Sequence, residues 1–286
     1  MKKILVLTDF SASSYNAAQY ANVLATQRGT SILLYNTVES IPIVPNYAGG
    51  GFVTETENLF AEESLGQLTQ VRTSLLAEQG KGPIIEILTG EGNLGSNIKK
   101  LLNEQAIELI VMGAPEGSLI NHLLTGSETR SVIKSANRPV LIIPGDKPIK
   151  PLNNFVLATD YRSADLCALR YLSAWIAVIG GRLDVVHIQT SDEVPQLTAQ
   201  QRQVFELFLN NLSFNNFQCH DLQGKDIRDR LDRFCQDKKA DVLAMINYHH
   251  DFFSRLLGNS QTFKELRHLQ LPMLVFPGNF NDETTA

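Results

Sequence analysis

The sequence predicts an α/β protein made of two doubly wound modules in tandem, each with a five-stranded, mostly parallel sheet. Short apolar runs bounded by Gly and Pro are typical of strands buried on both faces of such a sheet. These runs alternate with segments of helical length, and the second half of the chain repeats the first. With 286 residues, the chain is long enough for two ordinary domains.

The internal repeat is visible as constant separations between matching residues. Asp9, Tyr20 and Gly29 match Asp160, Tyr171 and Gly180 at a separation of 151, and Met112, Ser127, Thr129 and Pro139 match Met245, Ser260, Thr262 and Pro272 at 133. Two constant separations indicate two copies of one module, and the second copy lacks about 18 residues. We expect module 1 at 1–146 and module 2 at 153–279, with most of the missing length at 40–58.

The first elements form a βαβ unit, which predicts parallel strands and a right-handed crossover. Ile4 to Leu7 predicts a buried strand, and a helix follows from Ser11–Ser14 to Gly29 with Ser11 or Ser13 as its N-cap. Ile32 to Tyr35 predicts the second strand.

A long loop is predicted next, because residues 40–58 contain two prolines and a run of three glycines. The remaining elements of this part are a helix to about Glu78, a strand from Ile84 to Leu88 that Gly90 and Gly92 end, and a helix from Leu94 to Glu104. The loop at 40–58 is expected to be a mobile lid or an insertion.

Residues 109–144 hold the segment around which the first half is organised. An apolar run from Leu109 to Met112 stops at Gly113, a helix begins around Gly126-Ser127, and Val140 to Ile143 forms a last strand. A loop that leaves a buried strand and enters a helix through Gly and Ser offers free backbone N–H groups to an anion. Doubly wound sheets bind ligands at this carboxyl edge, so the segment predicts a phosphate cradle.

The spacing in this segment resembles the nucleotide loop of the universal stress protein family, Gly-x2-Gly-x9-Gly-Ser/Thr. Gly113 and the Gly126-Ser127 pair fit it, whereas Glu116 holds the place of the middle glycine and Gly117 follows one residue late. The motifs Thr8-Asp9-Phe10-Ser11 and Asn137-Arg138-Pro139-Val140 also resemble the family, so the likeness covers the whole first half. It implies a Rossmann-like fold of the adenine-nucleotide alpha-hydrolase type.

The resemblance also implies a set of ligand-binding residues in module 1. Asp9 falls where the family binds ribose hydroxyls, although it could equally cap the following helix. Thr37 falls at the adenine-facing position. The full set expected to bind ATP or another adenine nucleotide, with Mg²⁺, is Asp9, Thr37, Met112, Gly113, Gly117, Gly126 and Ser127.

Module 2 has lost this pattern, so no cofactor is expected there. Ile246 aligns with Gly113, Asn259 aligns with Gly126, and bulky residues fill the intervening loop. The chain also lacks a Walker loop, a Gly-x-Gly-x-x-Gly fingerprint after the first strand and a Gly-x-Ser-x-Gly elbow. No catalytic or metal-binding constellation is predicted, and the protein is expected not to be an enzyme.

Composition narrows the partners and the compartment. A net charge of −5 argues against a nucleic-acid partner, and no apolar run is long enough for a membrane helix. Three cysteines, an odd number without metal-like spacing, favour free thiols in the cytoplasm.

The functional hypothesis is therefore a non-catalytic protein of stress adaptation that binds a nucleotide in module 1. Two alternatives stay open: a switch in which ATP binding or slow hydrolysis changes the 40–58 loop, and a scaffold that binds another ligand or a protein through module 2. The resemblance also implies pairing through the last strands, Val140–Ile143 and Met273–Phe276, either within one chain as a pseudo-dimer or in a homodimer.

Overall fold

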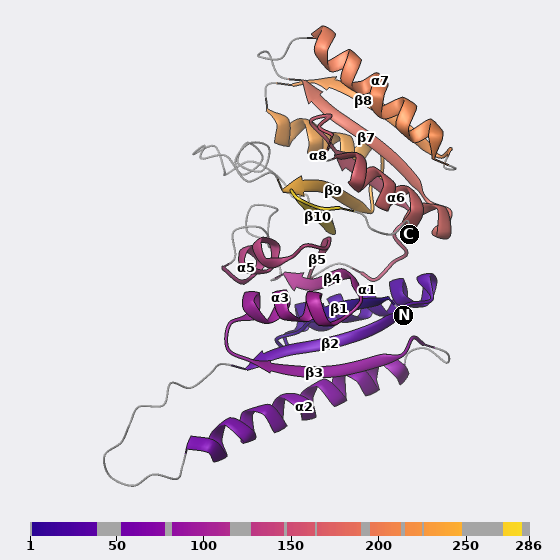
Figure 1. The fold of residues 1–286 in the computed structure, drawn as a ribbon. Helices are drawn as coiled ribbons and strands as arrows, with labels where there is room; N and C mark the ends of the chain where they lie inside the picture. Colours follow the sequence, from indigo (N-terminus) through magenta and orange to yellow (C-terminus); the bar gives the residue numbers. More distant parts are fainter. Residues whose placement is uncertain are drawn as a thin grey trace.

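The computed structural model contains one ten-stranded sheet to which each half of the chain contributes five strands (Figure 1). It describes residues 2–38, 53–77, 82–114, 127–145, 148–163, 165–189, 195–212, 215–224, 226–247 and 271–281. The strand order is β3-β2-β1-β4-β5-β10-β9-β6-β7-β8. Every neighbouring pair is parallel except β5 with β10, which is antiparallel.

The two halves share one order of elements apart from α5, whose counterpart position lies in 248–270, outside the described residues; the alternation of strands and helices confirms the predicted fold class. The first half contains β1 (Lys3–Leu7), α1 (Ala12–Arg28), β2 (Ser31–Val38), α2 (Val53–Ala77), β3 (Ile85–Glu91), α3 (Leu94–Glu104), β4 (Ile107–Ala114), α5 (Ser127–Ser135) and β5 (Val140–Pro144). The second contains β6 (Asn154–Ala158), α6 (Asp165–Ile179), β7 (Arg182–Gln189), α7 (Pro195–Asn211), β8 (Phe217–Gln223), α8 (Ile227–Asp237), β9 (Val242–Asn247) and β10 (Met273–Pro277). None of the helices among the described residues combines the length and the apolar character needed to cross a membrane.

The ends of α1 follow from its capping residues. The Ser11 hydroxyl accepts a hydrogen bond from the Ser14 N–H at 3.2 Å, which confirms Ser11 as the N-cap. At the other end Gly29 has a φ of 64° and donates its N–H to the carbonyl of Ala25. A residue without Cβ adopts this left-handed conformation without steric cost, so the chain turns there into β2.

Three predicted boundaries were wrong. The helix α2 already begins at Val53, inside the predicted loop, because a helix extends at low cost once its first turns have formed. It has 25 residues against 17 in α7, so the helix itself carries much of the length that module 2 lacks. Residues 39–52 lie outside the described part of the chain. Gly90 and Gly113 lie within β3 and β4 rather than at their ends, because both still pair with the neighbouring strand.

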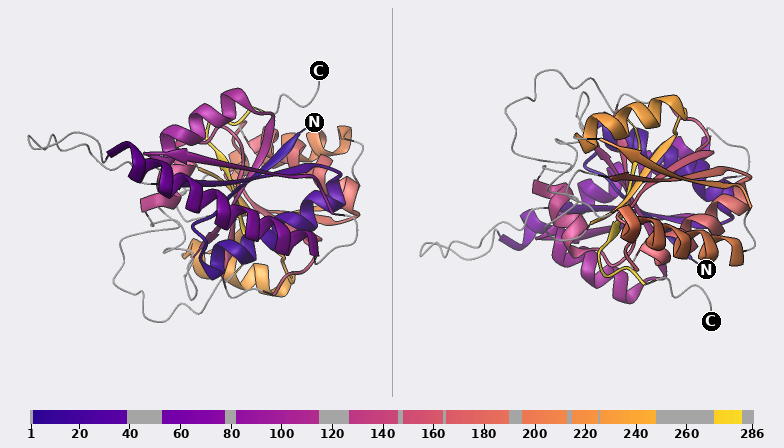
Figure 2. Two further views of the ribbon diagram at one scale, coloured as in Figure 1. Left: turned by 90° about the horizontal axis from the view of Figure 1, so that it is seen from below. Right: turned by 90° about the horizontal axis from the view of Figure 1, so that it is seen from above.

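Helices cover both faces of the sheet (Figure 2). One face packs against α1, α2, α6 and α7, and the other packs against α3, α5 and α8. The strands are therefore buried on both sides, and the central strand β4 has no exposed apolar side chain between Ile107 and Met112. This burial explains the nearly continuous apolar runs in the sequence.

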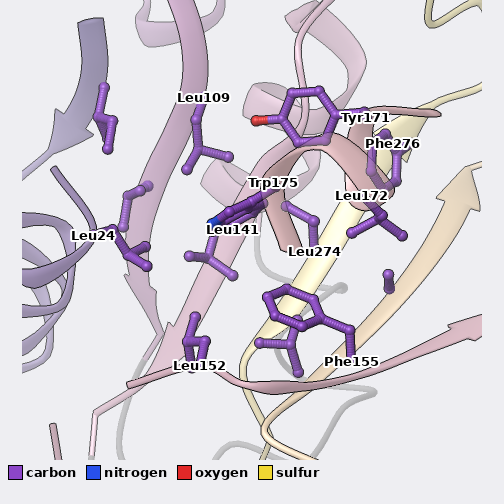
Figure 3. Packing of buried hydrophobic residues seen from close by; sticks show 14 of the residues in the cluster. Leu24, Leu109, Leu141, Leu152, Phe155, Tyr171, Leu172, Trp175, Leu274 and Phe276 are labelled. Carbon is purple, nitrogen blue, oxygen red and sulfur yellow. The ribbon is translucent and has the colours of Figure 1, made fainter. Parts of the chain in front are cut away.

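The two halves share one hydrophobic core at the place where β5 meets β10 (Figure 3). Trp175 of α6 is buried between the halves, and the guanidinium carbon of Arg28 lies 5.0 Å from the centre of its ring. Tyr171 packs against Phe276 and donates its hydroxyl to the Glu108 carbonyl at 3.4 Å. The pairing of last strands that the sequence predicted thus occurs within this chain.

The segment between the halves is held to both of them. Tyr20 of α1 donates its hydroxyl to the carbonyl of Pro148 at 2.6 Å. Lys150 forms an ion pair with Asp241 at 2.6 Å, and Asp241 also accepts the backbone N–H groups of Asn153 and Asn154. These contacts fix the path of the chain from β5 into β6.

Candidate functional site

A cavity of about 380 Å³ opens at the carboxyl ends of β1, β2 and β4, where the starts of α1, α3 and α5 also meet. A volume of this size is typical of small-molecule sites. Its lining consists mainly of hydroxyl, amide and backbone groups together with two carboxylates. The lining residues are Leu7, Thr8, Asp9, Ser14, Tyr35, Asn36, Thr37, Gly92, Asn93, Leu94, Met112, Gly113, Ser127, Glu128 and Ser131.

Five of the seven residues expected to bind a ligand line this one cavity. They are Asp9, Thr37, Met112, Gly113 and Ser127. The other two, Gly117 and Gly126, lie outside the described residues, as does Glu116. Residues from β2, from β4, from the turn after β1 and from α5 therefore meet at one place, although they are far apart in the sequence.

Asp9 lies two residues after the end of β1 and is held in place by the turn into α1. Its carboxylate accepts the backbone N–H of Ser11 at 3.0 Å and the Ser11 hydroxyl at 2.5 Å. Burial raises the pKa of Asp9, but hydrogen bonds from Ser11 and Ser14 outweigh this effect and hold the pKa below its usual value. Asp9 is thus an ionised acceptor at the rim, while the role of N-cap belongs to Ser11.

The turn that carries Asp9 is built from its neighbours. Phe10 has a φ of 65°, and its N–H donates to the Thr8 hydroxyl at 3.0 Å. The same hydroxyl forms a hydrogen bond with the Ser14 hydroxyl at 3.0 Å. Thr8 and Ser14 are both buried, so this pair fixes the first turn of α1 against the end of β1.

Gly113 allows α1 to approach the sheet closely. A Cβ at this position would meet the Ser13 carbonyl group and lie 2.7 Å from the Ser14 nitrogen. These are backbone atoms, which cannot rotate away as a side chain could. The absence of a side chain at Gly113 is therefore required by the packing of α1, independently of any ligand.

Thr37 and Tyr35 present hydroxyl groups at the end of β2. The Tyr35 hydroxyl lies directly over Gly90, where any Cβ would overlap it. Burial raises the pKa of Tyr35, and the neighbouring Thr37 hydroxyl lowers it by a smaller amount. The Thr37 hydroxyl oxygen is itself buried and has no hydrogen bond of good geometry among the described residues. A buried hydroxyl in a cavity wall that lacks a hydrogen bond of good geometry favours a ligand with hydrogen-bonding groups.

Several lining residues were not predicted from the sequence. The Asn36 amide donates to the Thr8 carbonyl at 2.8 Å and accepts the Ser64 hydroxyl at 2.8 Å, so it joins β1, β2 and α2. Asn93 caps α3 by accepting the Ser96 N–H at 3.0 Å. Polar residues at the end of an apolar run or just before a helix are the signals that could have identified both.

The charges of the described lining are all negative. Asp9 and Glu128 supply carboxylates, and none of the lining residues in the described part is Lys or Arg. Glu128 lies in the first turn of α5, where a carboxylate stabilises the helix dipole. The start of α5, which was expected to bind a phosphate, therefore already has a carboxylate beside it.

The corresponding edge of the second half keeps the turn but changes its chemistry. Tyr161 has a φ of 57°, and its N–H donates to the Thr159 hydroxyl at 2.8 Å, as Phe10 does to Thr8. Asp165 takes the place of Ser14: it is fully buried and accepts the Thr159 hydroxyl at 2.5 Å. His187 takes the place of Asn36 and donates Nδ1–H to the Thr159 carbonyl at 2.8 Å.

Comparison with known proteins assigns the first half to the family that its sequence motifs resemble. The family described as the Universal stress protein family matches residues 1–144. Universal stress protein MJ0577 of Methanocaldococcus jannaschii is 24% identical over 155 residues, which cover 50% of this chain and 94% of the relative. Universal stress protein MJ0531 of the same organism is 31% identical over 146 residues, which cover 51% of this chain and 84% of the relative.

A solved structure extends the similarity of fold to both halves. The crystal structure of a universal stress protein from Archaeoglobus fulgidus DSM 4304 superposes with a TM-score of 0.71 at 20% identity. The match covers 96% of this chain and 98% of that one.

Proposed function

This chain belongs to the universal stress protein family, and on that premise we propose that it acts in stress adaptation without catalysis, by binding an adenine nucleotide in module 1. Residues 1–146 form module 1 and residues 153–279 form module 2 in this proposal. The observation that carries it is the meeting of Asp9, Thr37, Met112, Gly113 and Ser127 around one cavity.

The cavity chemistry supports a ribose and a base as the parts that module 1 holds. Asp9 is ionised and exposed at the rim, and a carboxylate is a strong acceptor for ribose hydroxyls. Thr37 offers a buried hydroxyl beside the Tyr35 phenol, where the edge of a base would find a partner. Gly117, Gly126 and Mg²⁺ complete the site in this proposal.

We propose that the protein acts by binding a ligand and that it does so in the cytoplasm. The lining offers an ionised carboxylate, hydroxyls and amides, which bind and orient a ligand. The free thiols of Cys167, Cys219 and Cys235 support a reducing compartment.

The test uses a matched pair of variants, Asp9→Asn and Asp160→Asn, which make the same change at the repeated position. Calorimetric titration with adenosine should give one site per chain. Asp9→Asn should weaken binding by about tenfold or more, because a charge-assisted hydrogen bond is lost, whereas Asp160→Asn should leave binding unchanged. Two equivalent sites, or equal losses in both variants, would contradict the assignment to module 1.

A further inference from the structure

We infer that a second cavity, at the junction of the two halves, is a ligand site that takes a small aromatic carboxylate. This cavity has a volume of about 240 Å³. Its wall combines one side of α6 with residues near the amino ends of β1 and β4 and at the end of α1, and these include Lys2, Arg28, Glu108, Tyr171, Trp175 and Val178. The module 1 cavity opens at the carboxyl ends of the strands, so the two cavities lie at opposite edges of the sheet. The inference is therefore independent of the proposed function.

The aromatic part of the wall comes from α6. Tyr171 and Trp175 are one turn apart, and their buried rings have centres 6.1 Å apart and planes at 85°. Val178 follows on the same side of the helix and is 66% exposed, so it lies at the mouth of the cavity. The Nε1–H of Trp175 is buried and has no hydrogen-bond acceptor among the described residues. A buried N–H group in a residue that lines a cavity favours a ligand that brings an acceptor.

The charges around this wall leave one cation uncompensated. Glu108 is buried and forms an ion pair with Arg28, with 3.2 Å between Oε1 and Nη2. The guanidinium carbon of Arg28 lies 5.0 Å from the centre of the Trp175 ring, so this pair is placed against the aromatic wall. Lys2 also lines the cavity, is exposed and forms no ion pair within the described part of the chain. Two cations against one carboxylate favour a ligand with a single negative charge.

These features together define a chemical class of ligand. The cavity is smaller than a typical site for a drug-sized molecule, so its volume suits a compound with a single ring. Such a ring would pack against Tyr171 and Trp175. A carboxylate is a strong hydrogen-bond acceptor and carries one negative charge, so it meets both requirements of the wall. Because both halves contribute to the wall, the bound ligand would stabilise their association.

The experiment uses the fluorescence of Trp175, which is the only tryptophan of the chain and therefore reports on this cavity. The full chain is titrated with benzoate and with benzamide, a neutral molecule of the same shape. We expect a saturable change with benzoate and a Kd at least about tenfold higher for benzamide. Equal affinities, or no saturable change with benzoate, would overturn the inference. Excess adenosine should leave the benzoate titration unaltered, and competition between them would overturn the inference by placing benzoate in the module 1 cavity.

A matched set of variants locates the bound carboxylate. Val178→Lys adds a cation at the mouth and should lower the Kd for benzoate by about threefold, whereas Val178→Glu should raise it by about the same factor. Val178 is exposed, so neither change disturbs the core. Val204→Lys and Val204→Glu make the same changes on an exposed residue of α7 outside the cavity lining and should leave the Kd unaltered. A Kd that ignores both changes at Val178, or responds equally at Val204, would contradict a site at the junction.

Discussion

The first turns of α1 and α6 occupy repeated positions but approach the sheet differently. In module 1 the backbone of Ser13 and Ser14 packs directly over Gly113. In module 2 the aligned strand residue is Ile246, which is buried, and α6 begins at Asp165 rather than at Ser163, the residue aligned with Ala12. The close approach of α1 to β4 therefore requires a position without a side chain, whereas the aligned position in β9 carries a buried Ile.

The largest effect on the free energy of unfolding is expected at Gly113, the position that Ile246 occupies in the second half. Gly113→Ala should destabilise the protein by about 2–3 kcal/mol, because the new methyl group meets backbone atoms of α1. Ile246→Val should cost only about 1 kcal/mol, since it leaves a small cavity. Urea denaturation of both variants measures the difference. If Gly113→Ala is as stable as the unmodified protein, the first turn of α1 is free to move.

The next comparison concerns the residues that follow the conserved turn, Ser14 and Asp165. Asp165→Ala should cost about 2 kcal/mol, because it leaves the Thr159 hydroxyl and the Arg162 N–H without their acceptor. Ser14→Ala should cost about 1 kcal/mol, since it removes the hydrogen bonds of a neutral hydroxyl to the Thr8 hydroxyl and the Ser11 carbonyl rather than those of a buried carboxylate. Thermal unfolding compares the two, with Asp165→Asn as the variant that keeps an acceptor. Equal losses in the two alanine variants would mean that the buried carboxylate adds nothing beyond the hydroxyl.

The third comparison concerns the loop motif that module 1 partly keeps. Glu116 stands where the family pattern has glycine, so Glu116→Gly should strengthen ATP binding by about tenfold by removing charge and bulk. Glu116→Gln should recover part of that gain, because it removes only the charge. The measurement is the Kd for ATP with Mg²⁺ present. A marked loss of affinity in Glu116→Gly would instead mean that the glutamate holds the metal ion.

The smallest effect is expected at the rim of the cavity. Ser11→Ala removes the hydrogen bond from the Ser11 hydroxyl to Asp9 and should move the pKa of that carboxyl up toward its usual 3.8. Because the folded-state pKa is lowered, the ionised group stabilises the fold above its usual pKa, and this contribution disappears as pH falls through the lowered value. In Ser11→Ala, this stabilising contribution of Asp9 should disappear at a higher pH than in the unmodified protein. Carboxyl NMR titration measures the midpoint, and an unchanged midpoint would exclude Ser11 as the cause.

Much of the fold was predictable because burial on both faces leaves a direct mark on the sequence. The apolar runs of β1, β4 and β5 and the constant separations between the halves carried that information. Five residues of the cavity lining were predicted from the sequence because each follows or ends a strand or begins a helix that the sequence indicates. Tyr35 and Glu128 were missed because their place in the cavity depends on how distant elements pack. The early start of α2 was missed because helix extension follows from the turns already formed rather than from local composition.

The antiparallel contact between β5 and β10 has a consequence for how the two modules can differ. In a homodimer every substitution occurs twice and must suit both positions related by symmetry. Here the same kind of contact joins two segments of one chain, so a change in one half is not repeated in the other. Gly113 could therefore be kept for close packing beside the cavity while its counterpart became Ile246. A single chain therefore allows the cavity edge of one half to change without the same change in the other half and without loss of the shared sheet.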